Sequence, residues 1–262
     1  MTENDGGVVA TAFGSTLDSA RERIIVALDV PTEPEALKLA EELAGEVGFF
    51  KVGLELFTAM GPRIIQELVV RNCKVFLDGK FMDIPATVEG ASRAATQLGV
   101  RMFDVHCLGG RLMMSVALAA AREVSERANQ PRPRILGVTI LTSVDQRVLE
   151  DDLNIHQDLQ AQVVHLARAA SDVGLDGVIA SPHEVARLRA VLPSEMMIVT
   201  PGVRPAWAAV NDQKRIATPA ETIQAGADFI VVGRPITRPP RDVGTPASAA
   251  RLIAEEIASV HY

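Results

Sequence analysis

The chain has 262 residues and a formal net charge of -7 at pH 7, with 48% hydrophobic and only 4% aromatic residues. This length suits one sizeable domain, and the negative charge argues against nucleic acid as the main partner. No apolar run reaches the ~20 residues that span a membrane. Because Cys73 and Cys107 lack the Cys-x-x-Cys spacing, we expect reduced thiols and a cytoplasmic protein.

The start of the chain differs from the remainder. Residues 1–20 mix Gly, Thr, Asp and Glu, with no basic start followed by an apolar stretch. This composition is unlike a signal peptide, and we expect a disordered tail. No linker or composition break divides the rest, so residues 21–262 are predicted to form one domain.

From about residue 24 onward, short apolar runs rich in β-branched residues alternate with stretches of helical periodicity. The predicted strands are Ile24–Leu28, Phe49–Val52, Lys74–Leu77, Met102–Val105, Ile135–Ile140, Gly177–Ala180, Met197–Val199 and Phe229–Val232. Between them lie apolar stripes such as Ala36, Leu39, Ala40 and Leu43. This alternation predicts parallel pairing and favours a (β/α)₈ barrel over an open doubly wound sheet.

Charged side chains stand at the carboxyl ends of the first three predicted strands. They are Asp29, Lys51, Asp78 and Lys80, whose charges alternate in sign. The carboxyl ends of barrel strands meet at the active-site face, where unpaired charges are costly to desolvate. We therefore predict an interlocked array of carboxylate and ammonium groups.

Asp78-x-Lys80-x-x-Asp83 is the most specific spacing in the chain. Residues two apart in an extended segment point to the same side, so Asp78 and Lys80 are expected to face one pocket. Asp83 precedes Ile84-Pro85, and proline suits the first turn of a helix. The residues alone also allow a plainer interpretation, in which Asp83 only caps that helix and Lys80 is a surface charge.

Two segments with glycine and arginine follow the last two strands. They are Pro201-Gly202-Val203-Arg204-Pro205 and Gly233-Arg234-Pro235-Ile236. The loops after these strands form the usual phosphate site of such barrels. Glycine lets backbone N–H groups approach oxygen, and arginine adds a forked donor. The two segments predict a site for a phosphorylated anion, and the irregular stretches Ser143–Asn154 and Pro201–Lys214 are expected to be functional loops.

Three segments together resemble the orotidine 5′-phosphate decarboxylase family: LDGKFMDIP (77–85), TPGVR (200–204) and VGRPIT (232–237). Supporting segments are ALD (27–29), FKVG (50–53), VH (105–106), LTS (141–143) and NDQKR (211–215). The match keeps its order from about Ile24 to the final helix. It implies a homodimeric (β/α)₈ carboxy-lyase that converts orotidine 5′-monophosphate to UMP and CO₂ in pyrimidine biosynthesis.

The resemblance also implies roles for individual residues. Lys80 would be the proton donor, Asp78 would lie beside the substrate carboxylate, and Asp83 would enter from the neighbouring subunit. Asp29 and Lys51 would contact the ribose and join the charge array. The other implied binding residues are Thr87 across the interface, Thr142 at the pyrimidine, Gln213 between base and phosphate, Gly233 and Arg234 at the phosphate, and Arg204 as support for that loop. Gly79 and Met82 depart from the family pattern, where a bulky apolar and a polar residue are usual.

Decarboxylation at a pyrimidine C6 leaves a carbanion with no adjacent carbonyl, and most decarboxylases use a cofactor as electron sink. The sequence has no Gly-x-Gly-x-x-Gly fingerprint and its five histidines are scattered, with His106 expected to order the barrel rim. We therefore predict a reaction without cofactor or metal, driven by electrostatics. Two alternatives stay open: a Mg²⁺-dependent sugar-phosphate decarboxylase or aldolase of the same barrel group, and a silent nucleotide-binding barrel.

Overall fold

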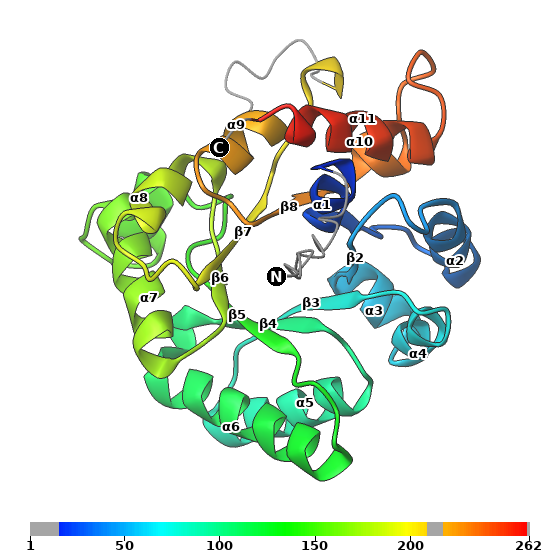
Figure 1. Ribbon diagram of the computed structural model, residues 1–262. Helices are drawn as coiled ribbons and strands as arrows, with labels where there is room; N and C mark the ends of the chain where they lie inside the picture. The colour runs from blue at the N-terminus through cyan, green and yellow to red at the C-terminus, as the bar shows by residue number, and fades with distance from the viewer. Residues whose placement is uncertain (1–15, 209–216, 261–262) are drawn as a thin grey trace, which may run out of the picture.

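The structure is a computed structural model that describes residues 16–208 and 217–260. Its eight strands form a closed parallel barrel in chain order, with β8 pairing back onto β1 (Figure 1). The strands are β1 (Ile24–Ala27), β2 (Phe49–Val52), β3 (Val75–Phe81), β4 (Met102–His106), β5 (Arg134–Val138), β6 (Gly177–Ile179), β7 (Met197–Pro201) and β8 (Phe229–Val232). The predicted fold is confirmed.

Helices surround the barrel on its outside (Figure 1). They are α1 (Thr16–Glu22), α2 (Glu33–Glu42), α3 (Leu54–Met60), α4 (Arg63–Val70), α5 (Pro85–Gln97), α6 (Gly110–Ala128), α7 (Leu159–Val173), α8 (Val185–Arg189), α9 (Pro219–Gln224), α10 (Arg234–Thr237) and α11 (Pro246–Ala258). Within the described residues no helix is both long and apolar enough to cross a membrane.

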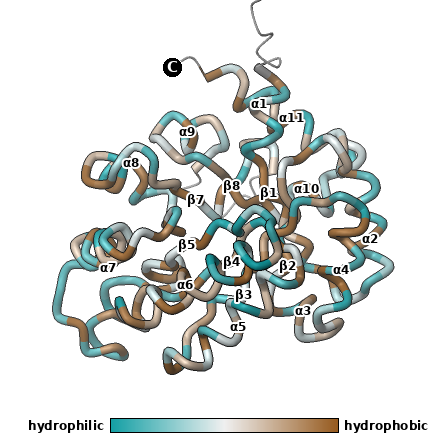
Figure 2. Tube along the Cα trace, turned by 60° about the horizontal axis from the view of Figure 1, so that its bottom comes forward, coloured by the Kyte–Doolittle hydropathy of each residue, from teal (hydrophilic) through white to brown (hydrophobic). Residues whose placement is uncertain are grey.

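Apolar side chains fill two layers because successive strand residues point to opposite faces. In β1, Ile24 and Val26 pack against the surrounding helices, whereas Ile25 points into the barrel. The barrel interior holds Ile25, Ala27, Phe49, Phe76, Met102, Leu136, Val138, Ile179, Val199 and Val231. Hydrophobic residues accordingly follow strands such as β5, β7 and β8, and hydrophilic residues mark the outer turns (Figure 2).

The predicted tail was wrong for its last residues. Residues 16–20 belong to helix α1, which packs against α11. Ala20 is buried, and Arg21 pairs with Glu46 at 3.2 Å. This short apolar contact gives no periodic signal, so composition alone suggested a tail. Residues 1–15 lie outside the described part of the chain.

Several strand ends differ from the predictions by one to four residues, and β3 and β5 are two examples. Strand β3 was expected over Lys74–Leu77 but continues to Phe81, and its register with β4 shifts between Leu77 and Phe81. Strand β5 was expected to reach Ile140 but ends at Val138, where its pairing with β6 stops. Both differences lie at the carboxyl ends of strands, where polar residues and a bulge obscure the alternation.

Candidate active site

Four charged side chains meet at the carboxyl ends of the first three strands. The ammonium of Lys51 lies 3.1 Å from Asp29 Oδ1 and 3.1 Å from Asp78 Oδ2. The other carboxylate oxygen of Asp78 accepts a hydrogen bond from Lys80 Nζ. The structure therefore brings together the array expected from the sequence, in the order Asp29, Lys51, Asp78, Lys80.

Burial and neighbouring charge act against each other in this array. Burial by itself lowers the pKa of Lys51, but the charges of Asp78 and Asp29 outweigh it and raise the pKa above its ordinary value. Burial would raise the pKa of Asp78, but Lys51 and Lys80 outweigh it and hold that pKa below its usual range. Lys51 and Asp78 therefore keep each other charged.

Two glycine features allow this geometry. At Gly53, just after β2, a Cβ atom would lie 2.8 Å from the Lys51 ammonium nitrogen. Any larger residue would therefore displace the ammonium from Asp29 and Asp78. At Gly79 a Cβ would lie 2.7 Å from the ring of Phe81, so the unusual glycine makes room for that aromatic side chain. Sequence reasoning noted Gly53 only as part of a matching segment.

Lys80 has a backbone conformation that the sequence did not predict. Its φ is +46°, in the left-handed region that non-glycine residues rarely adopt. Asp78 and Lys80 do meet, but across a bulged strand end rather than along the extended segment that was expected. The Lys80 N–H donates to Asp104 Oδ1 at 2.7 Å, and this hydrogen bond holds the unusual turn.

Asp104 lies on β4 and is fully buried beneath the array. Burial, with the adjacent charge of Asp78, raises the pKa of Asp104 well above the usual value of an aspartate. Oδ1 of Asp104 accepts the Lys80 N–H, whereas Oδ2 has no hydrogen-bond partner among the described residues, so a proton on Oδ2 would be available to the Asp78 carboxylate. Asp104 lies within the fourth predicted strand, Met102–Val105, and sequence reasoning assigned it no role, because a strand pattern does not show which carboxylate lies under the array.

His106 ends β4 beside this cluster. Its Nδ1 accepts the N–H of Leu108 at 3.3 Å and so caps the short turn Cys107–Gly109. Burial, followed by the charge of Lys80, lowers the pKa of His106. The side chain is therefore neutral at pH 7 and orders the rim, as the sequence suggested.

A cavity of about 230 Å³ opens next to the array. Lys51, Asp78 and Lys80 line one side of it, and the remaining wall is mainly apolar, with Phe76, Val138, Ile140, Leu141, Ile179, Ala180, Pro201 and Val231. Thr142 and Ser143 add hydroxyl groups at the mouth. A few charged groups against an apolar wall are typical of a site that orients a small planar ligand.

The predicted phosphate residues follow β7 and β8. Gly233 directly follows β8, and its carbonyl accepts the N–H groups of Ile236 and Thr237 as α10 begins. Arg234 is the first residue of α10 and its side chain is exposed. Arg204 is half-buried, and its N–H donates to the Ala217 carbonyl at 3.1 Å. Gln213 lies outside the described residues.

Asp83 and Thr87 do not line the cavity of their own chain. Asp83 is exposed and its Oδ1 accepts the neighbouring Ile84 N–H at 2.6 Å. Thr87 is exposed in the first turn of α5. Met82 and Ile84, on either side of Asp83, are 54% and 66% exposed.

Comparison with known proteins shows which family has this arrangement. The profile of the orotidine 5′-phosphate decarboxylase / HUMPS family matches residues 22–250. The chain belongs to this family. It is 47% identical to the orotidine 5′-phosphate decarboxylase of Moorella thermoacetica, over 92% of this chain and 94% of that protein. It is 44% identical to the Nostoc enzyme, over 92% and 99% of the two chains.

Comparison with solved structures points to the same family as the sequence comparisons. The crystal structure of orotidine 5′-phosphate decarboxylase from Lactobacillus acidophilus superposes with a TM-score of 0.78 at 36% identity. The superposition covers 89% of this chain and 98% of the other. The family match over residues 22–250 includes all eight strands and the strand ends that carry the charge array.

Proposed function

We propose that this enzyme decarboxylates orotidine 5′-monophosphate to UMP and CO₂, with Lys80 as the proton donor. The observation that carries the proposal is the Lys51–Asp78–Lys80 chain of ion pairs on the wall of a mainly apolar cavity. Such a cavity can take a pyrimidine ring while the charges address one edge of it. The identities of the relatives support this substrate.

The chemistry follows from charge placement. With the substrate carboxylate beside Asp78, the bond from C6 to the carboxyl carbon breaks and its electron pair stays on C6. The Lys80 ammonium stabilises this pair and then supplies the proton, so that CO₂ and UMP are the products. At ~4 Å and an effective dielectric constant of ~20, each such charge pair interacts by about 4 kcal/mol. Only the change between ground and transition state accelerates the reaction.

The carboxylates leave little coordination capacity for a metal ion. Asp29 and both oxygens of Asp78 already bind the ammonium groups of Lys51 and Lys80. The ammonium groups of Lys51 and Lys80 therefore supply the positive charge that Mg²⁺ would supply in a sugar-phosphate decarboxylase or aldolase. This arrangement supports a reaction that proceeds without an added metal.

Binding of the substrate phosphate is assigned to the end of β8 and the preceding loop. Arg234 and the Gly233 backbone would hold the phosphate, with Arg204 supporting the loop, Gln213 joining base and phosphate, and Thr142 reading the pyrimidine. Binding energy from this remote group can organise the charged site and exclude water from it. Asp29 and Lys51 would contact the ribose.

A homodimer would complete the site. Asp83 and Thr87 follow β3, are exposed and do not line the cavity of their own chain, so a second copy could receive them. Exposed apolar residues follow the neighbouring strands β2, β3 and β4 and give that interface an apolar surface: Leu54, Met82, Ile84, Leu108 and Leu112. The carboxylate of Asp83 from the second copy would then lie near Lys80, in addition to Asp78 of the same chain.

We place the enzyme in the cytoplasm, because its substrate is a phosphorylated nucleotide and both cysteines are free thiols. Cys107 is buried, and burial raises its pKa to about 12, so this thiol stays protonated. The cysteines therefore have no part in the proposed chemistry.

The test is the decrease in orotidine 5′-monophosphate absorbance in the presence of EDTA. The unaltered enzyme should keep its activity in EDTA, and Lys80→Ala should reduce activity by at least the ~10²–10⁴-fold that a general acid contributes. UMP should still bind the Lys80→Ala chain, measured by calorimetry. Arg127→Ala, an exposed change on α6 that does not line the cavity, is the control. Near-normal turnover in Lys80→Ala, or inactivation by EDTA, would contradict the proposal.

A further inference from the structure

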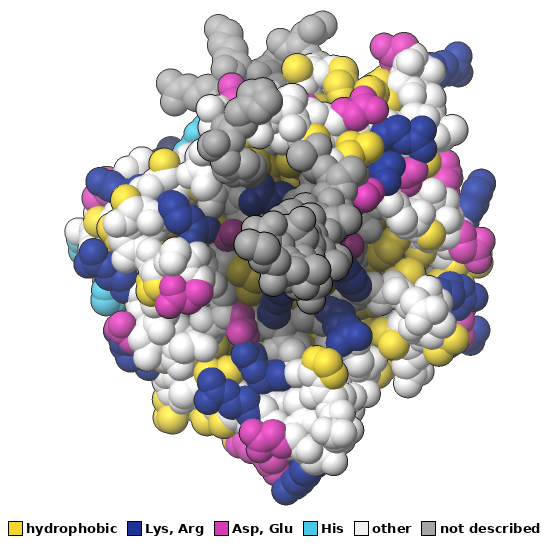
Figure 3. Space-filling model, viewed as in Figure 1, with side chains coloured by type: hydrophobic (Ala, Val, Ile, Leu, Met, Phe, Trp, Pro, Cys, Tyr) yellow, Lys and Arg dark blue, Asp and Glu magenta, His cyan; other side chains and the backbone are white. Residues whose placement is uncertain are grey.

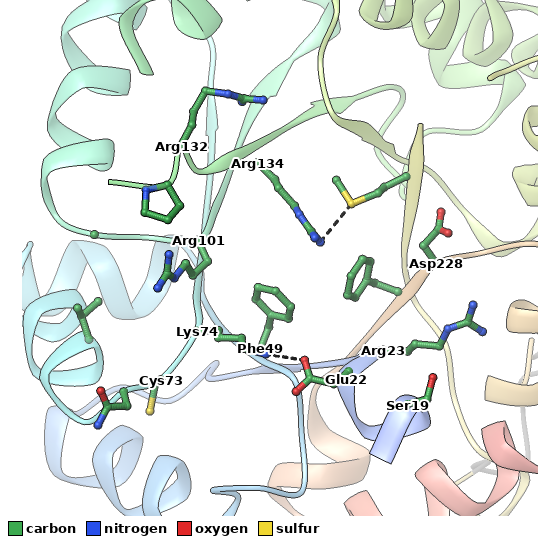
Figure 4. Close-up of a pocket in the computed structure, with 16 residues that line it drawn as sticks. Ser19, Glu22, Arg23, Phe49, Cys73, Lys74, Arg101, Arg132, Arg134 and Asp228 are labelled. Carbon is green, nitrogen blue, oxygen red and sulfur yellow. Dashed lines mark hydrogen bonds and ion pairs between the residues drawn. The ribbon is translucent and has the colours of Figure 1, made fainter. Parts of the chain in front are cut away.

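A second, larger cavity lies at the amino-terminal end of the barrel, opposite the active site. Its volume is about 970 Å³. Most of its wall comes from residues at or just before the starts of strands, and Figure 4 shows how their side chains surround the opening. Nothing in the proposed decarboxylation uses this end of the molecule.

Positive charge collects around this cavity. Five cationic side chains line it, whereas Glu22 and Asp228 are the only acidic ones among the described lining residues. The cations are Arg23, Lys74, Arg101, Arg132 and Arg134. Figure 3 shows lysine and arginine gathered around the centre of this face. Such a concentration stands out because the whole chain carries a net charge of -7.

Two of these cations have no carboxylate partner within the described residues. Lys74 pairs with Glu22 at 2.6 Å, and Arg132 pairs with Asp176 at 2.6 Å. Arg101 and Arg134 have no such ion pair in the described part of the chain. The guanidinium of Arg134 lies instead against soft groups, Met197 Sδ at 3.4 Å and the face of the Phe229 ring at 5.9 Å.

The barrel fixes the positions of both unpaired arginines. Arg101 N–H donates to the Val75 carbonyl at 2.8 Å, and Arg134 N–H donates to the Arg101 carbonyl at 2.9 Å. The floor beside them is aromatic, because the Phe49 and Phe229 rings meet edge to face at 5.6 Å. A cleft with charge of one sign and low-dielectric walls concentrates the electric field on an incoming counter-ion.

We propose that this cavity binds a polyphosphate, free or carried by a nucleotide, with Arg101 and Arg134 as the principal donors. Forked guanidinium groups on neighbouring strands suit adjacent phosphate groups, each of which can accept a bidentate hydrogen bond. The volume is within the range of small-ligand sites and exceeds what inorganic phosphate needs. The site is separate from the decarboxylase centre, so a ligand here would act as an effector or a stabiliser.

The test uses pyrophosphate as the probe and isothermal calorimetry on the full chain, with UMP present in saturating amount to fill the active site. One pyrophosphate should bind per chain. The double variant Arg101→Ala/Arg134→Ala should bind pyrophosphate at least about tenfold more weakly for each charge-assisted hydrogen bond that the substitutions remove. Arg147→Ala, which removes an exposed arginine elsewhere, should bind as tightly as the unaltered chain.

The source of the phosphate groups is resolved by comparing ATP with tripolyphosphate. Tighter binding of ATP identifies a nucleotide that uses the aromatic floor, and equal binding identifies an inorganic polyphosphate. Decarboxylase activity without added ligand should be unchanged in the double variant. The proposal is overturned if the unaltered chain binds no pyrophosphate under these conditions, or if the double variant binds it equally well. Neither outcome affects the assignment of the decarboxylase site, which has its own assay.

Discussion

At the scale of single residues, the placement of the Lys80 ammonium depends on a buried carboxyl that does not touch it. Asp104 accepts the Lys80 backbone N–H, and it lies close enough to Asp78 for the charge of Asp78 to raise the Asp104 pKa. The positive φ of Lys80 is costly for a residue with a side chain. The strain persists because Asp104 stabilises the turn, so Asp104 is a positioning residue.

Two substitutions of Asp104 distinguish the contribution of its hydrogen bonds from that of its ionisable group. Asp104→Asn keeps an oxygen for the Lys80 N–H and adds an amide donor toward Asp78, so it should keep most of the decarboxylase activity. Asp104→Ala removes both and leaves a buried N–H unpaired, which costs about 1–3 kcal/mol and should lower kcat about tenfold or more. Steady-state kinetics measure both. An equal decrease in the two variants would exclude the positioning role.

The raised pKa of Asp104 also predicts a pH effect on stability. The folded chain keeps a proton that the unfolded chain releases above its ordinary pKa of about 3.9. Stability from this group is therefore complete below that value and decreases as pH rises toward the folded pKa. Asparagine does not titrate, so the stability of Asp104→Asn relative to the unaltered chain should increase between pH 5 and pH 8. Urea unfolding at several pH values measures the difference, and a constant difference would show that Asp104 is ionised in the fold.

At the scale of elements, the bulged end of β3 brings Asp78, Gly79 and Lys80 to the cavity. Its register with β4 shifts after Leu77, and Phe81 packs against Phe103 with ring centroids 5.8 Å apart. This aromatic pair anchors the far side of the bulge. The aromatic pair requires a residue without a side chain at position 79, because a Cβ atom on Gly79 would collide with the Phe81 ring.

Gly79→Ala should therefore destabilise the bulge. The added methyl group forces the Phe81 ring to move, and overpacking of this kind costs about 1–3 kcal/mol. Thermal unfolding should show a lower Tm, and kcat should fall because Lys80 is adjacent. Adding Phe81→Leu should restore part of both. Gly90→Ala, on α5 where the added Cβ meets nothing within 4 Å, is the matched control and should be neutral or stabilising. An unchanged Tm in Gly79→Ala would mean that the Phe81 ring has room to move.

Strand β3 contains both features that the sequence predicts and features that it does not. Alternation located all eight strands, because buried parallel strands are short apolar runs between helices. Charges at the ends of these runs located Asp29, Lys51, Asp78 and Lys80, since strand ends converge in a barrel. The left-handed Lys80 and its bond to Asp104 could not be predicted, because both depend on a register shift between two strands. The cationic cavity was also missed, since its residues come from separate strand starts that carry no local motif.

At the scale of the whole molecule, the two ends of the barrel have different charge arrangements. At the carboxyl ends of the strands, lysines and aspartates neutralise one another around a mainly apolar cavity. At the amino-terminal end, cations exceed acidic groups and two arginines have no carboxylate partner in the described residues. Because the same strands connect both ends, each strand contributes to a structural core and to a binding surface.

The proposed dimer makes each active site depend on two chains, and this dependence can be measured by mixing variants. Lys80→Ala inactivates the site of its own chain, whereas Asp83→Ala inactivates the site of its partner. In a mixed dimer, one site lacks both groups and the other keeps Lys80 from one chain and Asp83 from the other. With equal amounts and free exchange, about half of the dimers are mixed, and each mixed dimer has one intact site of its two. About a quarter of the normal activity should therefore return.

The readout is decarboxylase activity after each inactive variant is incubated alone and after the two are incubated together. Subunit exchange is verified by tagging one variant and recovering the mixed dimer through the tag. Recovery of activity only in the mixture establishes that Asp83 acts across the interface. If the verified mixed dimer stays inactive, Asp83 acts within its own chain, where its carboxylate accepts the Ile84 N–H before α5 begins.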